Sequence, residues 1–250
     1  MEVAMATLPV EKIAEKIILS LDHDFWEDAL HDAKLFAKIG GKWVKVNPIH
    51  LTDKGWGIVT ILKDLGLKIF ADPKFFNTEK VLGKTAEVAC KYGPDMMNCA
   101  ATSGLNAMSN FATECLTADL TCMSIAVTLL TSIGPKECME TYCRSPAKQV
   151  QLFAEQAARS GIDGVVCSGH ELKTLKSDPV TENLWTVVPG IRNLGDDSGD
   201  QMRIMTPYRA LQAGADYLVI GSSLIKGDLS KNWDNTRRLY TQEQNDKFSA

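Results

Sequence analysis

Apolar residues gather in short runs that recur roughly every 25–30 residues, the spacing expected of repeated βα units. The runs are almost wholly apolar rather than alternating, which is typical of parallel strands buried on both faces. Each run therefore predicts one strand of a parallel sheet. The predicted strands are Ile17–Asp22, Trp43–Asn47, Leu67–Ala71, Met96–Ala101, Ile125–Leu130, Gly164–Ser168, Trp185–Val188 and Tyr217–Gly221.

Stretches with helical periodicity lie between these runs. Ser145 and Pro146 form an N-cap and first-turn pair, an apolar stripe follows them, and Gly161 comes after its end. Thr206-Pro207 begins a second helix of this kind, which Gly214 closes.

Eight strands with eight helical connections predict an α/β fold, a (β/α)8 TIM barrel. The main alternative is a doubly wound open sheet, but no glycine-rich first turn accompanies the first strand. We expect one barrel domain over residues 1–250. The polar tail, residues 231–250, is expected to be a final helix or partly disordered.

Composition narrows the classes of function. A net charge of −4 and a pI near 5.6 argue against a nucleic-acid-binding surface. No apolar stretch is long enough to span a membrane. The first twenty residues have no basic start before Lys12, so we expect no signal peptide. We therefore expect neither nucleic acid nor membrane as a partner.

The chain has seven cysteines, an odd number, and no two of them form a CxxC pair. Its four histidines are widely spaced along the sequence. These features indicate reduced core thiols in a cytoplasmic protein, and they predict no metal site.

Asp72-Pro73-Lys74 follows the third predicted strand, and it is the most informative short segment of the chain. Residues two apart on a strand point to one face. Opposite charges held so close shift each other's pKa, so the pair can give or take a proton. Asn77 lies three residues further on and carries no charge where a second carboxylate would complete an alternating array.

Polar residues also follow the other predicted strands, at the barrel end where such folds carry their chemistry. A lone Ser or Thr in this place is usually a helix N-cap. Inward-facing charges such as Lys45 and Asp72 are costly unless they are paired or used, which favours a site. The strand-end set is Asp22, Lys45, Asp72, Lys74, Thr102, Ser103, Thr131, Ser132, Ser168, Arg192, Gln201, Ser222 and Ser223.

A long glycine-punctuated loop, Val188–Pro207, follows the seventh strand, and Ile220–Ser223 follows the eighth. Together they occupy the usual phosphate site of these barrels. Backbone N–H groups at loops and helix N-termini bind phosphate without a special side chain. We therefore expect a phosphorylated ligand here.

These segments resemble the orotidine 5′-monophosphate decarboxylase family. The resemblance runs from about Ile17 to Gly221, and its longest continuous part is Pro189–Pro207. The matching pieces are Leu21-Asp22, Lys45, Asp72-x-Lys74, Leu129–Ser132, Gly161–Ser168, Pro189–Arg192, Gly199–Pro207 and Tyr217–Gly221.

The resemblance implies a decarboxylase without metal or cofactor, which converts orotidine 5′-monophosphate to uridine 5′-monophosphate as a homodimer with composite active sites. Lys74 would protonate the pyrimidine C6 as carbon dioxide leaves. Asp72 would lie beside the substrate carboxylate, and Lys45 would hold Asp72 and a ribose hydroxyl. The remaining pyrimidine-nucleotide-binding residues would be Asp22, Thr102, Thr131, Pro189, Arg192, Gln201, Gly221 and Ser222.

The chain departs from the family pattern at both ends of the expected ligand. Asn77 stands where the family has a second acid, which would act in the partner's site. Val81 replaces a threonine that meets the partner's substrate, and Ser222 replaces an arginine whose guanidinium would grip the phosphate. A histidine of the fourth strand is absent at Ala100, and Asn47 replaces a glycine.

Three functions remain open on the sequence. The first is decarboxylation of a 6-carboxypyrimidine nucleotide, at a full or an impaired rate, with Lys74 as the proton donor. The second is a catalytically inactive nucleotide-binding protein on the same scaffold. The third is a lyase acting on a different, less phosphorylated substrate.

Overall fold

The computed structural model describes residues 9–193, 196 and 204–248. Eight parallel strands form a closed barrel in which every strand pairs with its neighbours in sequence and β8 pairs with β1. The strands are β1 (Ile17–Ser20), β2 (Trp43–Val46), β3 (Lys68–Phe75), β4 (Met96–Ala100), β5 (Met123–Val127), β6 (Gly164–Val166), β7 (Trp185–Val188) and β8 (Tyr217–Ile220). The predicted (β/α)8 barrel is confirmed.

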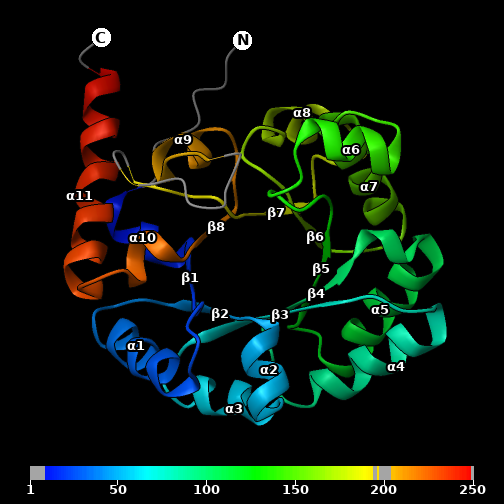
Figure 1. Ribbon diagram of the computed structural model, residues 1–250, viewed down its shortest axis with the longest axis horizontal. Helices are drawn as coiled ribbons and strands as arrows, with labels where there is room; N and C mark the ends of the chain where they lie inside the picture. The colour runs from blue at the N-terminus through cyan, green and yellow to red at the C-terminus, as the bar shows by residue number, and fades with distance from the viewer. Residues whose placement is uncertain (1–8, 194–195, 197–203, 249–250) are drawn as a thin grey trace.

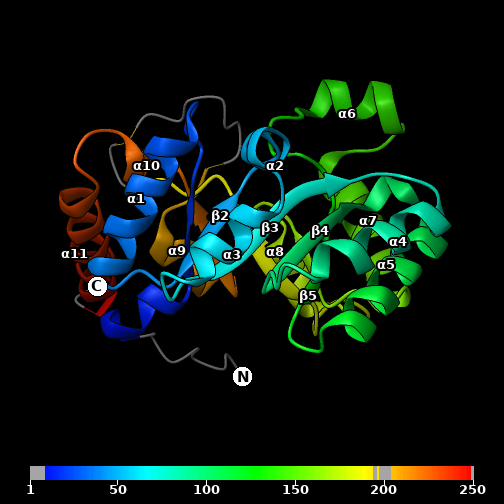
Figure 2. The same cartoon turned by 90° about the horizontal axis from the view of Figure 1, so that it is seen from below.

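Helices surround the strand ring (Figure 1), and α6 projects at one end of the molecule (Figure 2), where it contacts α7. Two short 3-10 helices, η1 (Val10–Glu15) and η2 (Ala101–Ser103), complete the described elements. The α-helices are α1 (Trp26–Lys38), α2 (Pro48–Lys54), α3 (Gly57–Lys63), α4 (Glu79–Cys90), α5 (Leu105–Ala118), α6 (Pro135–Tyr142), α7 (Pro146–Arg159), α8 (Leu172–Ser177), α9 (Pro207–Gln212), α10 (Ser222–Ile225) and α11 (Leu229–Phe248).

The helix boundaries at α7 and α9 are those predicted from the sequence. Ser145 is the N-cap of α7, and Gly161 follows its end with φ of 77°. Thr206 is the N-cap of α9 and its hydroxyl accepts a hydrogen bond from the Arg209 N–H at 3.3 Å. Gly214 ends this segment with φ of 101°, a conformation that glycine adopts without strain.

The predicted bounds of β7 are confirmed, five other strands end one or two residues earlier than predicted, and β3 and β5 differ most. β3 continues past the predicted end at Ala71 to Phe75. β5 begins earlier, at Met123, and ends at Val127 rather than at Leu130. Its pairing with β6 ends at Val127–Val166, because the β6 partner strand stops there and the chain turns into the site loop. Apolar composition alone continues through Leu129 and Leu130, so it cannot mark this end.

The hydrophobic core has two parts. A ring of side chains fills the barrel interior, and a larger cluster lies between the strands and the helices. The interior ring consists of Ile18, Trp43, Phe70, Met96, Ile125, Val187 and Val219. It closes the barrel from within, so the functional groups sit above it at the strand ends.

The C-terminal helix α11 packs against the barrel beside α1 and α9 (Figure 1). Its Trp233 ring lies edge-on to Phe36 of α1, with the centroids 5.1 Å apart. Tyr240 is buried and packs in the same way on Tyr208 of α9. Although mainly polar, this segment therefore contributes aromatic side chains to the core. Within the described chain, we find no helix with the length and apolar character that a bilayer crossing requires.

Candidate active site at the carboxyl ends of the strands

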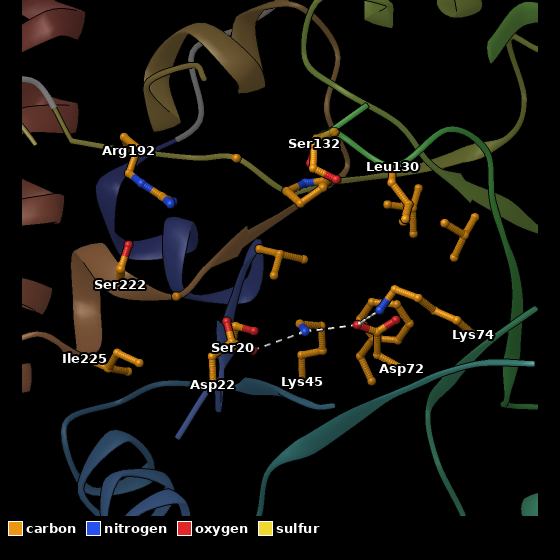
Figure 3. Close-up of a pocket in the computed structure, with 18 of the residues that line it drawn as sticks. Ser20, Asp22, Lys45, Asp72, Lys74, Leu130, Ser132, Arg192, Ser222 and Ile225 are labelled. Atoms are coloured by element: carbon orange, nitrogen blue, oxygen red, sulfur yellow. Dashed lines mark hydrogen bonds and ion pairs between the residues drawn. The ribbon is translucent and has the colours of Figure 1, made fainter. Parts of the chain in front are cut away.

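A cavity of about 600 Å3 opens at the carboxyl ends of the strands (Figure 3). Each strand other than β4 contributes to the lining of this cavity, either directly or through the loop that follows it. The lining residues are Ser20, Asp22, Lys45, Phe70, Asp72, Lys74, Val127, Leu129, Leu130, Thr131, Ser132, Val166, Pro189, Gly190, Arg192, Val219, Gly221, Ser222, Ile225 and Lys226.

Four alternating charges form a chain of contacts on one wall of this cavity, and we call them the charged row: Asp22, Lys45, Asp72 and Lys74. The Lys45 Nζ lies 3.5 Å from Asp22 Oδ1 and 2.9 Å from Asp72 Oδ2. The Lys74 Nζ lies 2.8 Å from the same Asp72 oxygen (Figure 3). Asp72 therefore accepts hydrogen bonds from two ammonium groups at once.

The charges of the row stabilise one another's ionised forms. Burial would raise the pKa of Asp72, but Lys45, Lys74 and the amide of Asn98 outweigh it and lower the pKa. Burial would lower the pKa of Lys45, but Asp72 and Asp22 outweigh it and raise the pKa. Desolvation of Asp22 is likewise outweighed, chiefly by Lys45, and its pKa is lowered. All three groups are therefore charged at neutral pH.

The two lysines of the row differ in exposure. The Lys45 side chain is 12% exposed and touches two carboxylates, so it is held inside the wall. The Lys74 side chain is 39% exposed and faces the open cavity. Of the two ammonium groups, that of Lys74 is the more open to a ligand.

A bulge in β3 places Lys74 beside Asp72. The pairing of β3 with β4 shifts between Ala71 and Phe75, and Lys74 has a φ of 51°. A non-glycine residue in this region is strained and needs support. Asn98 of β4 provides it, because its side-chain oxygen accepts the Lys74 backbone N–H at 2.8 Å. Simple strand alternation predicted the contact correctly, but the backbone achieves it by an irregular path.

Asn98 also holds Asp72, the acid that pairs with Lys74. Its amide donates to Asp72 Oδ1 at 2.5 Å, and its side chain is fully buried. Asn98 is not among the site residues predicted from the sequence. Its signal was present, since Asn98 is the one polar residue in the run Met96–Ala101.

Asp22 is held by Asn47 on one side and lies close to the Gly221 backbone on the other. The Asn47 amide donates to Asp22 Oδ1 at 3.4 Å and to the Leu21 carbonyl at 3.3 Å. On the other side, a Cβ on Gly221 would lie 2.7 Å from Asp22 Oδ2. Only glycine therefore fits at the end of β8 without moving this carboxylate.

Arg192, Ser222 and Ile225 line the side of the cavity away from Lys74 (Figure 3). Lys226 follows Ile225 in the chain and also lines the cavity, and we call these four residues the opposite wall. Arg192 is 8% exposed and its guanidinium donates to the carbonyl of Ile191 at 2.9 Å. Ser222 is the first residue of α10, and its side chain is short and neutral. This wall carries two cations and no acid among its members.

Nine of the twelve residues predicted for the site line the cavity: Asp22, Lys45, Asp72, Lys74, Thr131, Pro189, Arg192, Gly221 and Ser222. Thr102 and Asn77 are exposed and do not line it. The Asn77 side chain accepts the N–H of Thr78 at 2.8 Å. Gln201 lies outside the described residues.

The lining offers cations in excess of acids, since Lys45, Lys74, Arg192 and Lys226 face only Asp22 and Asp72. A cavity of this charge attracts an anionic ligand. It also presents an ammonium group that can deliver a proton at the end of the row. The arrangement is suited to proton transfer on an anion that spans both walls.

Comparisons with known proteins show which family the chain is similar to. Residues 15–231 match the model of the "Orotidine 5'-phosphate decarboxylase / HUMPS family". The orotidine 5'-phosphate decarboxylase of Pseudoalteromonas translucida is 38% identical over 224 residues, covering 88% of this chain and 94% of the relative. That of Streptococcus suis is 34% identical, covering 82% and 84%. The crystal structure of the Lactobacillus acidophilus enzyme of this name has a TM-score of 0.75 and 27% identity, covering 90% of this chain and 98% of its own.

Proposed function

Since the chain belongs to the orotidine 5'-phosphate decarboxylase / HUMPS family, we propose that it decarboxylates a 6-carboxypyrimidine nucleotide, orotidine 5′-monophosphate, to uridine 5′-monophosphate. The observation that carries the proposal is the contact of Lys45 and Lys74 with one oxygen of Asp72, at 2.9 and 2.8 Å. The names of the relatives support the choice of substrate.

In the proposed reaction the bond between C6 and the carboxylate breaks, and its electron pair stays on C6 as carbon dioxide leaves. The Lys74 ammonium stabilises this developing carbanion and then gives it a proton, which forms the C6–H bond. Lys74 regains a proton from solvent. These steps use the charges of the side chains alone, so the proposal includes neither metal nor cofactor.

The other residues of the charged row orient the reacting groups. Asp72 holds the Lys74 ammonium in place and would lie beside the substrate carboxylate. Lys45 is buried between Asp72 and Asp22, where it can hold the acid and a ribose hydroxyl. Preorganised charges of this kind act strongly because they need no rearrangement as the reaction proceeds. Asp22 is placed to bind the ribose.

The phosphate would bind at the opposite wall. Arg192 and Lys226 supply positive charge there, and the backbone N–H groups at the start of α10 are directed outward from its N-terminus. Thr131 and Pro189 line the cavity between the two walls. The family resemblance alone assigns Thr102 to the pyrimidine edge and Gln201 to a bridge between the phosphate and the base.

Carbon dioxide release from orotidine 5′-monophosphate, measured beside calorimetric binding of uridine 5′-monophosphate, tests the proposal. We expect release in the wild type and a loss of about 1,000-fold or more in Lys74→Ala, because proton donation and carbanion stabilisation are lost together. Lys84→Ala is the matched control, since Lys84 is an exposed lysine of α4 paired with Glu87. Its activity should not change.

Two other outcomes correspond to the alternative functions. Binding without release would indicate a nucleotide-binding protein without turnover, which the excess of cations in the cavity favours. Release from a substrate without phosphate would indicate a lyase of different specificity, which Ser222 favours. Either result would contradict the proposed activity.

We further propose a homodimer in which Asn77 acts in the partner's cavity. In the single chain Asn77 is exposed and outside its own cavity. Large apolar side chains are exposed near it, with Phe76 at 66% and Val81 at 45%. An apolar surface of this kind at the site's edge is suited to contact with a second copy.

Asn77→Asp tests this arrangement. A carboxylate at position 77 would complete the alternating charges of the composite site and repel the substrate carboxylate before it leaves. We expect turnover to rise about tenfold or more, equivalent to at least about 1.4 kcal/mol of the barrier. Sedimentation of the same variant should show a dimer. Unchanged turnover, or an active monomer, would argue against a role for residue 77 across an interface.

A further inference from the structure

Three cysteines converge on the side of the barrel opposite the cavity. Cys90 ends α4, Cys115 lies in the last turn of α5, and Cys122 directly precedes β5. Their Sγ atoms all lie within 4.8 Å of one another. Cys115 is fully buried, and Cys90 and Cys122 are each 5% exposed. All three are free thiols, so they form a compact sulfur cluster that the decarboxylation mechanism does not use.

The spacing of the cluster is close to that of a three-thiolate metal site. With a metal–sulfur bond of about 2.3 Å, three sulfur atoms in a plane around an ion are about 4.0 Å apart. The observed limit of 4.8 Å exceeds this value by less than 1 Å. Rotation of the cysteine side chains can close such a gap without a change of fold.

The donor set selects the kind of ion. Within the described part of the chain, no histidine or carboxylate joins these three sulfur atoms as a fourth ligand. Structural zinc sites almost always have four protein ligands. Soft thiolate donors favour Cu(I) among the first-row ions. A buried set of three sulfurs and no oxygen or nitrogen is therefore best suited to a soft ion that accepts three donors.

We propose that Cys90, Cys115 and Cys122 form a binding site for a soft d10 metal ion, with Cu(I) as the favoured ion. Each ligating thiol loses its proton to solvent as its sulfur–metal bond forms, and no electron is transferred. The bound ion would connect the ends of α4 and α5 to the start of β5.

The site is separate from the proposed chemistry. Helices of the barrel run back from the carboxyl ends of the strands, so the ends of α4 and α5 lie at the opposite end from the cavity. Bound metal should therefore change stability and leave decarboxylation nearly unchanged. Uptake of metal and turnover can be scored independently on the same protein.

Anaerobic titration of the full chain with Cu(I), in competition with a Cu(I) chelator, tests the site. We expect one equivalent bound per chain, with X-ray absorption showing three sulfur neighbours. Cys115→Ser should weaken binding by about 100-fold or more, the loss typical when a metal site is damaged. Cys143→Ser is the control, because Cys143 is exposed and outside the cluster, and it should bind as the wild type does.

Two further measurements guard against a variant that simply folds poorly. Binding to the wild type should strengthen by at least about tenfold for each rise of one pH unit below the thiols' pKa values, because protons leave on binding. Cu(I) should raise the melting temperature of the wild type and of Cys143→Ser, but not that of Cys122→Ala. Absence of uptake, or uptake that Cys115→Ser and Cys122→Ala leave unchanged, would overturn the proposal and identify the cluster as apolar packing.

Discussion

The two walls of the cavity are built in opposite ways (Figure 3). In the charged row each ion contacts an ion of opposite charge. The Asn47 amide donates a hydrogen bond to Asp22, and the Asn98 amide donates one to Asp72. The opposite wall has Arg192 and Lys226 but a short, neutral Ser222 at the start of α10. The groups proposed for the chemistry are therefore preorganised by the chain itself, whereas the groups proposed to bind the distal anion are few. Damage to the first wall should reduce turnover, and changes in the second should alter affinity.

Asp72→Asn should have the largest effect, since it removes the acid that two lysines share. Loss of one partner from a buried ion pair typically costs about 3–5 kcal/mol, because the other charge remains buried. We expect a lower free energy of unfolding in urea by that amount, together with a fall in turnover of about 100-fold or more. Asp53→Asn is the control, because Asp53 is an exposed acid paired with Lys54, and its stability should stay close to that of the wild type. Equal costs in the two variants would show that the row is not preorganised.

The same variant predicts a change in the pH dependence of stability. The folded pKa of Asp72 is lowered from 3.8, so its contribution is present above that value and is lost as the pH falls through the folded pKa. The folded pKa of Lys45 is raised from 10.5, so its contribution is present below that value and is lost as the pH rises through the folded pKa. Melting temperatures recorded against pH should show a shallower acid limb in Asp72→Asn than in the wild type. Parallel acid limbs would contradict this account.

Asn98→Ala isolates the support behind the row. It leaves Asp72 Oδ1 without its amide donor and the strained Lys74 backbone without its acceptor. An unsatisfied buried group costs about 1–3 kcal/mol. We expect turnover to fall about tenfold with little change in KM, because Asn98 lies behind the charged row and does not line the cavity. Asn110→Ala, which removes an amide bonded to the Glu79 carbonyl on the helix surface, is the control. A change in KM with constant turnover would assign Asn98 to binding instead.

Ser222→Arg should strengthen the weaker wall. A guanidinium at this position can form a bidentate contact with phosphate. We expect KM for orotidine 5′-monophosphate to fall about tenfold, equivalent to about 1.4 kcal/mol, with turnover nearly constant. Orotidine, which lacks the phosphate, serves as the control substrate and should show no gain. A gain with both substrates, or with neither, would mean that the phosphate does not bind at the start of α10.

The family and the barrel could be predicted from the sequence because both depend on local signals. Eight apolar runs with capped helices between them indicate parallel strands and their order, since a strand buried on both faces must be apolar throughout. Asp72, Lys74 and Lys45 could be selected because a charge at an inward-facing strand position needs a partner. Strand ends were less predictable, as β5 shows, because a strand ends where its partner ends.

The tertiary structure alone decided how these residues act together. Asn98 could be recognised as a support only once β4 lay beside the bulge in β3, where one side chain bonds both Asp72 and the Lys74 backbone. The convergence of Cys90, Cys115 and Cys122 depends on the packing of α4 on α5, and no spacing in the sequence indicates it. The sequence by itself determined the barrel and the identity of its charged groups, because periodicity and charge are properties of neighbouring residues. Contacts between distant residues depend on strand register and helix packing, which exist only in the folded chain.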